Sequence, residues 1–82
     1  MKARVAVRLK PAILDPQGKA VHQALHQLGY GEVSEVRVGK LIELNLDGND
    51  RQALAGRVDE MSRKLLTNPL VETFEVTLDD ER

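Results

Sequence analysis

The sequence predicts an α+β domain with the element order β-α-β-β-α-β, and three observations support this fold class. Apolar and polar residues alternate near the start, in the middle and near the end of the 82-residue chain, which is typical of strands with one buried face. Two stretches between these segments carry apolar residues at helical spacing. Each of these stretches follows an aspartate that can cap a helix.

The first predicted strand covers residues 3–10. Its pattern alternates along the whole stretch and predicts one buried face and one polar face. The apolar set is Ala3, Val5, Val7 and Leu9, and the other set is Arg4, Ala6, Arg8 and Lys10.

Residues 14–18 predict a sharp entry into the first helix. Asp15 is a strong N-cap because its carboxylate accepts hydrogen bonds from the unpaired amides of the first turn. Pro16 then takes the first helical position, where its missing N–H costs nothing. The carboxylate also lies at the positive end of the helix dipole. We expect a helix over residues 16–28, ended by Gly29. Its apolar stripe is Val21, Ala24, Leu25 and Leu28.

A β-hairpin is predicted next, with strands over residues 35–38 and 42–46. Gly39 and Lys40 would form the turn between them. Gly-Lys is a weaker turn signal than Asn-Gly, so the loop length stays open.

The last part of the chain predicts a helix and then a strand. Asp50 is the expected N-cap of the second helix, and Asn68-Pro69 ends that helix because the residue before proline avoids the α region. The final strand centres on residues 73–78, and residues 79–82 are expected to be a flexible tail. The stripe of the second helix is Leu54, Val58, Met61 and Leu65, and that of the strand is Phe74, Val76 and Leu78.

With right-handed crossovers, this order gives a ferredoxin-like fold, a four-stranded antiparallel sheet with both helices on one face. The opposite face is polar, carries both charge signs, and can either be solvated or meet another sheet through ion pairs. Its residues are Arg4, Ala6, Arg8, Glu35, Arg37, Glu43, Thr73, Glu75 and Thr77.

Composition limits the function. A chain of 82 residues predicts one domain, spanning residues 1–82, with a small core that association would reinforce. It has no cysteine, which excludes disulfides and thiolate metal sites and fits a cytoplasmic location. No apolar run suggests a membrane span or a secretory signal. Residues 1–40 carry a net charge of +4 and residues 41–82 one of −5, a separation that favours pairing within the fold or across a subunit contact.

Few residues suggest chemistry. His22 and His26 have the i, i+4 spacing of two metal ligands, but we interpret them as surface histidines because nothing nearby completes a site. Ser34 and Ser62 lack a nucleophile context, and no phosphate-binding loop is present. RNA binding through stacked aromatics is disfavoured, since Phe74 falls in the buried phase. We therefore expect no catalytic, cofactor-binding or metal-binding residues, and a binding or assembly module.

Three motifs, in order and spanning nearly the whole chain, resemble the PurS family. They are Leu-Asp-Pro-Gln-Gly at residues 14–18, Val-Arg-Val-Gly-Lys-Leu-Ile-Glu-Leu at 36–44, and Lys-Leu-Leu-Thr-Asn-Pro-Leu-Val-Glu-Thr-Phe-Glu-Val at 64–76. That family is the small accessory subunit of phosphoribosylformylglycinamidine synthase in purine synthesis.

The resemblance implies a subunit of an ATP-dependent amidotransferase and ligase complex, with no activity expected from this chain alone. A glutaminase subunit would release ammonia, and a synthetase subunit would hold ATP and Mg²⁺. The small subunit would bridge the two, assist ammonia transfer and form dimers or tetramers. A regulatory ferredoxin-like domain that binds a small ligand at a dimer interface is the alternative.

The resemblance places partner contacts at the corners of the fold. The bland alternative for several of these residues is that they only cap and stop helices, whereas capping does not explain Arg37 and Lys40. The candidates are Asp15, Pro16, Gln17, Gly18, Arg37, Gly39, Lys40, Asn68 and Pro69.

Overall fold

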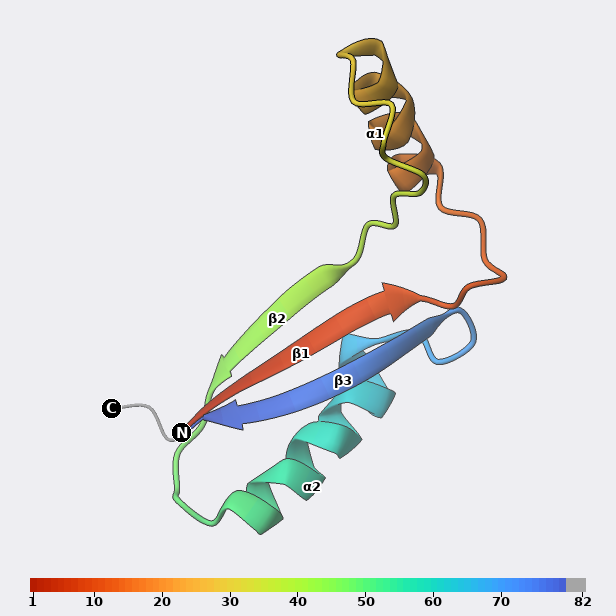
Figure 1. The fold of residues 1–82 in the computed structure, drawn as a ribbon. Helices are drawn as coiled ribbons and strands as arrows, with labels where there is room; N and C mark the ends of the chain where they lie inside the picture. The colour runs from red at the N-terminus through yellow and green to blue at the C-terminus, as the bar shows by residue number, and fades with distance from the viewer. Residues whose placement is uncertain (80–82) are drawn as a thin grey trace.

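The computed structural model describes residues 1–79 and contains three strands and three helical segments (Figure 1). Within that part of the chain, no helix is long and apolar enough to cross a membrane. The elements in chain order are β1 (Lys2–Leu9), α1 (Pro16–Gln27), β2 (Lys40–Asn45), α2 (Arg51–Met61), the π-helix η1 (Ser62–Leu66) and β3 (Glu72–Asp79).

The sheet has the order β2-β1-β3, and both pairs of strands are antiparallel. The first strand is therefore the central one. Val7 faces Lys40 on β2 and Phe74 on β3, whereas Lys2 at the other end faces Asn45 and Asp79. The alternating patterns of β1 and β3 predicted these strands to within about a residue at each end.

The core lies between one face of the sheet and α2. Val5 of β1 has an exposed fraction of 0%, as has Val58 of α2. Partly buried residues from β2, β3 and η1 complete this small cluster. The other face of the sheet is polar, as the alternation predicted, and ion pairs form within the sheet there, with Arg4 between Glu43 and Asp79.

The predicted strand over residues 35–38 does not form, and so neither does the hairpin or the four-stranded sheet. The segment over residues 33–39 instead has no regular secondary structure and leads into β2 without a turn (Figure 1). Lys40, expected in the turn, is the first residue of β2 and pairs with Val7. The alternation of Val36 and Val38 therefore does not correspond to a strand, and the weak Gly-Lys turn signal does not reverse the chain.

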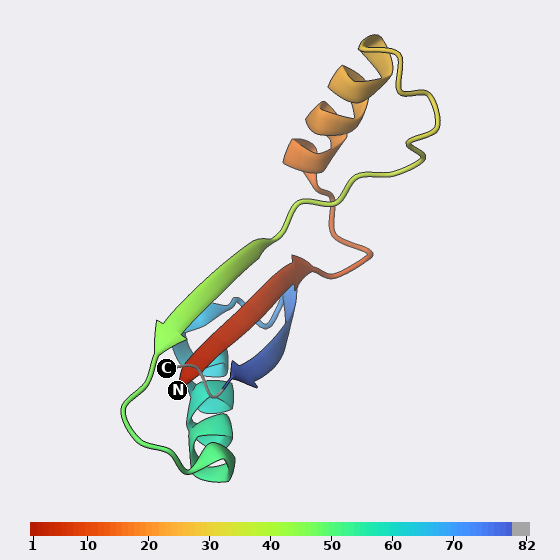
Figure 2. The same cartoon turned by 60° about the vertical axis from the view of Figure 1, so that its left-hand side comes forward.

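The predicted packing of the first helix on the sheet is also wrong. α1 has nearly the predicted bounds, but it projects beyond the end of the sheet and covers neither face (Figures 1 and 2). Its apolar stripe is largely exposed, and Leu28 has an exposed fraction of 73%. The radius of gyration is 16.2 Å, against about 12 Å for a compact chain of this length.

The second helix begins where it was predicted, because the Asp50 carboxylate accepts a hydrogen bond from the N–H of Ala53 at 3.2 Å. The prediction that Leu65 joins its buried stripe is wrong. The last turn widens into η1, and Leu65 faces solvent while Leu66 packs against the core. Asp79, assigned to a tail by the sequence, is the last residue of β3. The rest of that predicted tail lies outside the described residues.

Candidate functional site at the junction of arm and body

Two parts of the molecule meet at one junction. We call residues 10–39, with α1 at their centre, the arm, and we call the sheet with α2 and η1 the body. Two chain segments connect them, residues 10–15 on the way out and residues 36–39 on the way back (Figure 2). These segments hold parts of two of the three family-like motifs identified in the sequence.

Asp15 ties the two connecting segments together. One carboxylate oxygen accepts the N–H of Gly18 at 2.9 Å, and this is the predicted N-cap. The other accepts the N–H of Val38 at 2.7 Å, which capping alone does not explain. The residue is buried, with an exposed fraction of 6%. The N–H of Val38, followed by that of Gly18, holds the pKa of Asp15 below its ordinary value of 3.8, although burial opposes the shift.

Two glycines allow the backbone to pass closely at this junction. A Cβ atom on Gly18 would collide with the carbonyl oxygen of Val36 and with the Asp15 carboxylate. A Cβ atom on Gly39 would collide with the carbonyl oxygen of Val7 in the central strand. Both positions therefore require glycine for lack of space, whether or not a partner contacts them.

Arg37 secures the outgoing segment. Its guanidinium donates to the carbonyl oxygens of Lys10 at 3.1 Å and Ile13 at 2.9 Å. These two bonds hold the bend between β1 and α1, so Arg37 has a role within the chain that the sequence did not indicate. Partner contact by the exposed part of Arg37 stays a prediction.

Lys40, Glu72 and Asn68 form a second link, between the middle and the last family-like motif. Lys40 Nζ lies 3.8 Å from one carboxylate oxygen of Glu72, and the other oxygen accepts the N–H of Asn68 at 2.7 Å. Glu72 was missed by the sequence reasoning. A signal was available, because Glu72 has the same phase as the apolar residues of β3 and is thus an acid on the core face.

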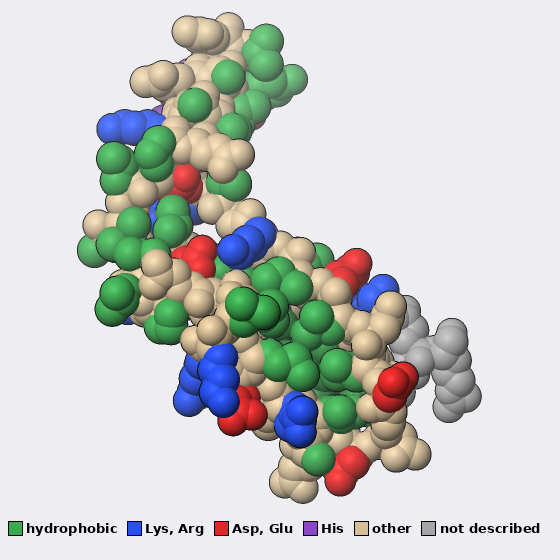
Figure 3. Space-filling view, turned by 180° about the vertical axis from the view of Figure 1, so that it is seen from behind, with side chains coloured by type: hydrophobic (Ala, Val, Ile, Leu, Met, Phe, Trp, Pro, Cys, Tyr) green, Lys and Arg blue, Asp and Glu red, His purple; other side chains and the backbone are tan. Residues whose placement is uncertain are grey.

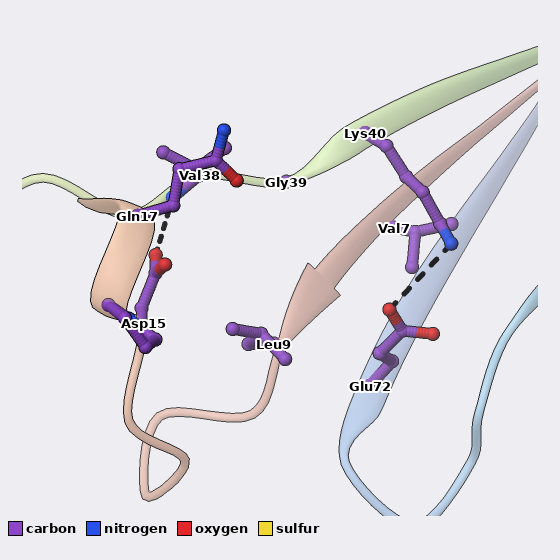
Figure 4. A pocket seen from close by; sticks show the side chains of 9 residues that line it. Val7, Leu9, Asp15, Gln17, Val38, Gly39, Lys40 and Glu72 are labelled. Carbon is purple, nitrogen blue, oxygen red and sulfur yellow. Dashed lines mark hydrogen bonds and ion pairs between the residues drawn. The ribbon is translucent and has the colours of Figure 1, made fainter. Parts of the chain in front are cut away.

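The junction encloses an open cavity of about 440 Å³ between the start of α1 and the end of the sheet (Figure 4). Its floor is apolar, and charged groups lie at its edges. In Figure 4 the Asp15 carboxylate points toward Val38 on one side, and the Lys40–Glu72 pair lies on the other. The lining residues are Val7, Leu9, Asp15, Pro16, Gln17, Val38, Gly39, Lys40 and Glu72.

The structure thus brings most of the predicted site residues to one place. Five of them line the cavity, Gly18 and Arg37 adjoin it, and Asn68 reaches it through Glu72. Pro69 lies in the exposed turn that follows. The five lining residues are Asp15, Pro16, Gln17, Gly39 and Lys40.

His22 and His26 form hydrogen bonds within the arm. Both Nε2 atoms lie within hydrogen-bond distance of the Val33 carbonyl oxygen, at 2.9 and 2.8 Å, and so hold the returning segment against α1. Among residues 1–79, no group of three or more potential ligands could hold a metal ion.

The chemistry available at the junction is that of binding. The cavity lining combines aliphatic side chains with charged groups that already have partners, and it contains no hydroxyl, thiol or imidazole. An apolar floor with polar edges suits the burial of another protein's side chains.

Comparison with known proteins gives a consistent picture. A family model described as "PurS: Phosphoribosylformylglycinamidine (FGAM) synthase" matches residues 2–80. The chain is 44% identical to the PurS subunit of Bacillus subtilis phosphoribosylformylglycinamidine synthase, covering 96% of this chain and 93% of that one. It is 46% identical to the Synechocystis subunit, with 90% and 76% covered.

Solved structures agree. The Methanocaldococcus jannaschii PurS structure matches with a TM-score of 0.88 at 33% identity, covering 99% and 98% of the two chains. A chain in the structure of PurLQS from Thermotoga maritima matches with a TM-score of 0.85 at 28% identity, covering 93% of each.

Proposed function

The chain belongs to the PurS family and is an accessory subunit of phosphoribosylformylglycinamidine synthase in purine biosynthesis, and on this premise we propose how it serves that enzyme. It acts without catalytic groups of its own, as a bridge between the glutaminase and synthetase subunits. The observation that carries this proposal is that residues from all three family-like motifs line the open cavity at the junction.

The division of labour follows from the residues. Glutaminases of the cysteine type need a thiolate nucleophile, and this sequence has no cysteine. ATP-dependent phosphoryl transfer needs phosphate donors and metal-binding carboxylates around one site. ATP and Mg²⁺ therefore belong on the synthetase subunit, and ammonia is formed on the glutaminase subunit. The bridge holds the two close enough for ammonia to pass between them in the cytoplasm.

The solved PurLQS assembly from T. maritima supports a bridging role, because it includes a chain of this fold. The junction supplies a suitable surface, with an apolar floor to bury and the Lys40–Glu72 pair beside it. Lys40 is more than half exposed, so its ammonium can exchange Glu72 for a carboxylate on a partner.

A second copy of the chain is the other partner that we propose, as a dimer or tetramer. α1 has 12 residues and buries little apolar surface within its own chain, whereas isolated helices of this length are marginal in water. Leu28 and Val21 are exposed along it, and hydrophobic side chains are visible on both arm and body in Figure 3. Covering such side chains is worth about 1.5–3 kcal/mol each.

The bridging proposal is tested by co-purification with the glutaminase and synthetase subunits, with and without ADP, Mg²⁺ and glutamine. Lys40→Glu is expected to weaken recovery of the complex several-fold while leaving the far-UV circular dichroism unchanged. Arg57→Glu is the matched control, since Arg57 is exposed on α2 and has no ion pair within the described chain. Equal recovery with both variants would contradict a contact at Lys40.

Sedimentation of the isolated chain over a range of concentrations tests self-association. We expect a dimer or tetramer that dissociates when Leu25 and Leu28 are both replaced by Ser, because both belong to the apolar stripe of α1. A monomer with fully formed α1 at every concentration would contradict this proposal. In the same samples, a large rise in Tm with a nucleotide or amino acid, without partner subunits, would favour a regulatory ligand-binding domain instead.

A further inference from the structure

The outer edge of β2 is open to another strand. β2 and β3 are the edge strands on either side of β1. Hydrogen bonds alternate along an antiparallel strand, so every second residue directs its backbone N–H and C=O groups away from its neighbour. An edge strand therefore presents a row of unpaired groups to which a further strand can add.

The outward backbone groups of β2 belong to its odd-numbered residues. The N–H of Leu46 donates to the carbonyl oxygen of Met1 at 2.8 Å, and the ammonium of Met1 donates to the carbonyl oxygen of Leu46 at 3.1 Å. From this pair, the register directs the even-numbered residues of β2 toward β1 and the odd-numbered ones outward. The outward set is Leu41, Glu43 and Asn45.

The edge formed by β3 is blocked at one end. The N–H of Lys10 donates to the carbonyl oxygen of Val71 at 2.8 Å, and from this pair the register directs the carbonyl group of Leu78 outward. The guanidinium of Arg51 on α2 donates to that oxygen from Nη1 at 2.9 Å and from Nη2 at 2.7 Å. The two edges therefore differ, and β2 is the one at which the sheet can grow.

The charges of the motif at residues 36–44 are complementary to a second copy of the same motif. An antiparallel pair centred on Lys40 places Arg37 opposite Glu43 of the second copy, and the two-fold axis repeats this contact. Within residues 36–45, no register centred on residues 41–43 places opposite charges directly across from each other, and the one centred on Glu43 places two carboxylates there. Charge therefore selects the register centred on Lys40.

The side chains that form these ion pairs are accessible. Both hydrogen bonds of Arg37 within its own chain come from Nη2, which leaves the other guanidinium nitrogens for a carboxylate. The side chain of Glu43 is 50% exposed. The two Lys40 residues at the axis are kept apart, because each ammonium lies 3.8 Å from a carboxylate oxygen of Glu72 in its own body.

The apolar residues of the motif agree with the same register. It places Val38 opposite Ile42 of the second copy, and branched aliphatic side chains opposite each other stabilise sheets. It also places Leu41, which is 58% exposed, opposite Gly39, which has no side chain to obstruct it. The N–H of Val38 is held by Asp15 where β1 has ended, so pairing can extend β2 through residues 36–39 from the other side.

We propose that the open edge of β2 pairs with β2 of a second copy, antiparallel and centred on Lys40, so that two three-stranded sheets join into one. This inference rests on the proposed self-association and assigns it a surface in addition to α1. The second copy supplies the neighbouring strand that residues 36–39 lack in the single chain. Because the pair is two-fold symmetric, each copy covers the open edge of the other and the assembly closes.

The test uses two charge reversals in the full-length chain, Arg37→Glu and Glu43→Arg, each made separately. Each variant alone places like charges opposite each other twice in the pair, and we expect its dissociation constant, measured by sedimentation at low salt, to rise about tenfold. An equimolar mixture of the two variants should recover most of the wild-type affinity, because each chain then meets opposite charges in the other.

Recovery on mixing cannot arise within one chain. Arg37 and Glu43 are six residues apart, which is about 20 Å along an extended strand, and any loss of their contacts within the chain would persist in the mixture. Arg8→Glu is the matched control, since Arg8 is an exposed cation on the central strand. It should change the dissociation constant less than about twofold.

The outcomes separate this inference from the proposal on which it rests. If the wild-type chain were a monomer at every concentration, self-association itself would fail. A wild-type dimer or tetramer that neither reversal weakens would overturn the pairing of β2 while self-association through α1 stands. A mixture that associates no more tightly than the single variants would overturn it as well.

Hydrogen exchange examines the edge directly. The N–H groups of Leu41 and Glu43 face outward from β2, so they should exchange at least about tenfold more slowly in the assembled protein than in a sample diluted to monomer. The N–H of Ile42 faces β1 and should be protected in both samples. If Leu41 and Glu43 were protected only after the glutaminase and synthetase subunits were added, a partner subunit would occupy the edge and the proposal would be wrong.

Discussion

The body and the arm are stabilised in different ways. In the body, strands from both ends of the chain pack with α2 around side chains that water does not reach. In the arm, the fully buried residues are Asp15 and Gly18, and both lie at the junction. The body is thus a small hydrophobic core, whereas the arm is a helix fixed at its base by hydrogen bonds. Because α1 is fixed at its base and its apolar side chains are exposed, these side chains are available for contact with other molecules.

The stability of the body and that of the arm should differ most in their response to an introduced negative charge. Val5→Asp would leave a carboxylate without a partner in the core, at a cost of more than about 4 kcal/mol, which is comparable to the whole stability of a domain this size. Val21→Asp, on the exposed face of α1, should leave the body folded. Circular dichroism and thermal unfolding distinguish the two. Equal unfolding of the body in both variants would contradict this difference in stabilisation between the body and the arm.

Gly39→Ala tests the junction itself. The added methyl group meets the Val7 carbonyl oxygen, which belongs to the central strand and cannot move away easily. We expect a loss of about 1–3 kcal/mol in the free energy of unfolding, the usual range for overpacking. Gly56→Ala is the control, since a Cβ atom there meets nothing within 4 Å. Chemical denaturation measures both, and an equally harmless Gly39→Ala would show that the junction is loose.

Acid should loosen the arm through Asp15. Its pKa is held below 3.8 in the folded chain, so the folded state binds fewer protons than the unfolded state near that pH. The stabilisation is therefore complete above about pH 3.8 and is lost as the pH falls through the lower, folded pKa. Tyr30, the sole tyrosine in a sequence without tryptophan, provides a fluorescence signal from the arm. Asp15→Asn should lack this acid-dependent step, and an identical acid profile in both proteins would count against it.

The smallest effect should come from the polar face of the sheet. Arg8 and Glu75 form an exposed pair at 3.9 Å, and such pairs contribute between about zero and 1 kcal/mol. Arg8→Ala should therefore change Tm by no more than about a few degrees. A large loss would indicate that the body depends on its surface charges as well as on its core.

The sequence predicted local structure well and packing less well, for physical reasons. Asp15 and Asp50 cap the helices as expected, because capping depends on one side chain and the next three residues. The alternation along β1 and β3 likewise predicted their buried faces. The stripe of α1 indicated an apolar face but could not indicate what covers it. The alternation of Val36 and Val38 could not indicate whether a neighbouring strand would be available for pairing.

The candidate site was predicted in its parts but not in its arrangement. The motif residues were identified, yet the links between them depend on close backbone approaches, such as that of Gly39 to Val7. Leu65 was misplaced because its exposure depends on a change of helix type that apolar spacing does not report. Glu72 could have been found by treating an acid in the buried phase of a strand as a signal.

The central position of β1 has a consequence for how the protein is made. Lys2 pairs with Asp79, so β1 can complete its pairing only after β3 has been synthesised. Contacts between distant parts of a chain form slowly, and an unpaired strand invites aggregation while it waits. A chain shortened before β3 should therefore fail to fold, because β1 would lose one of its two neighbouring strands.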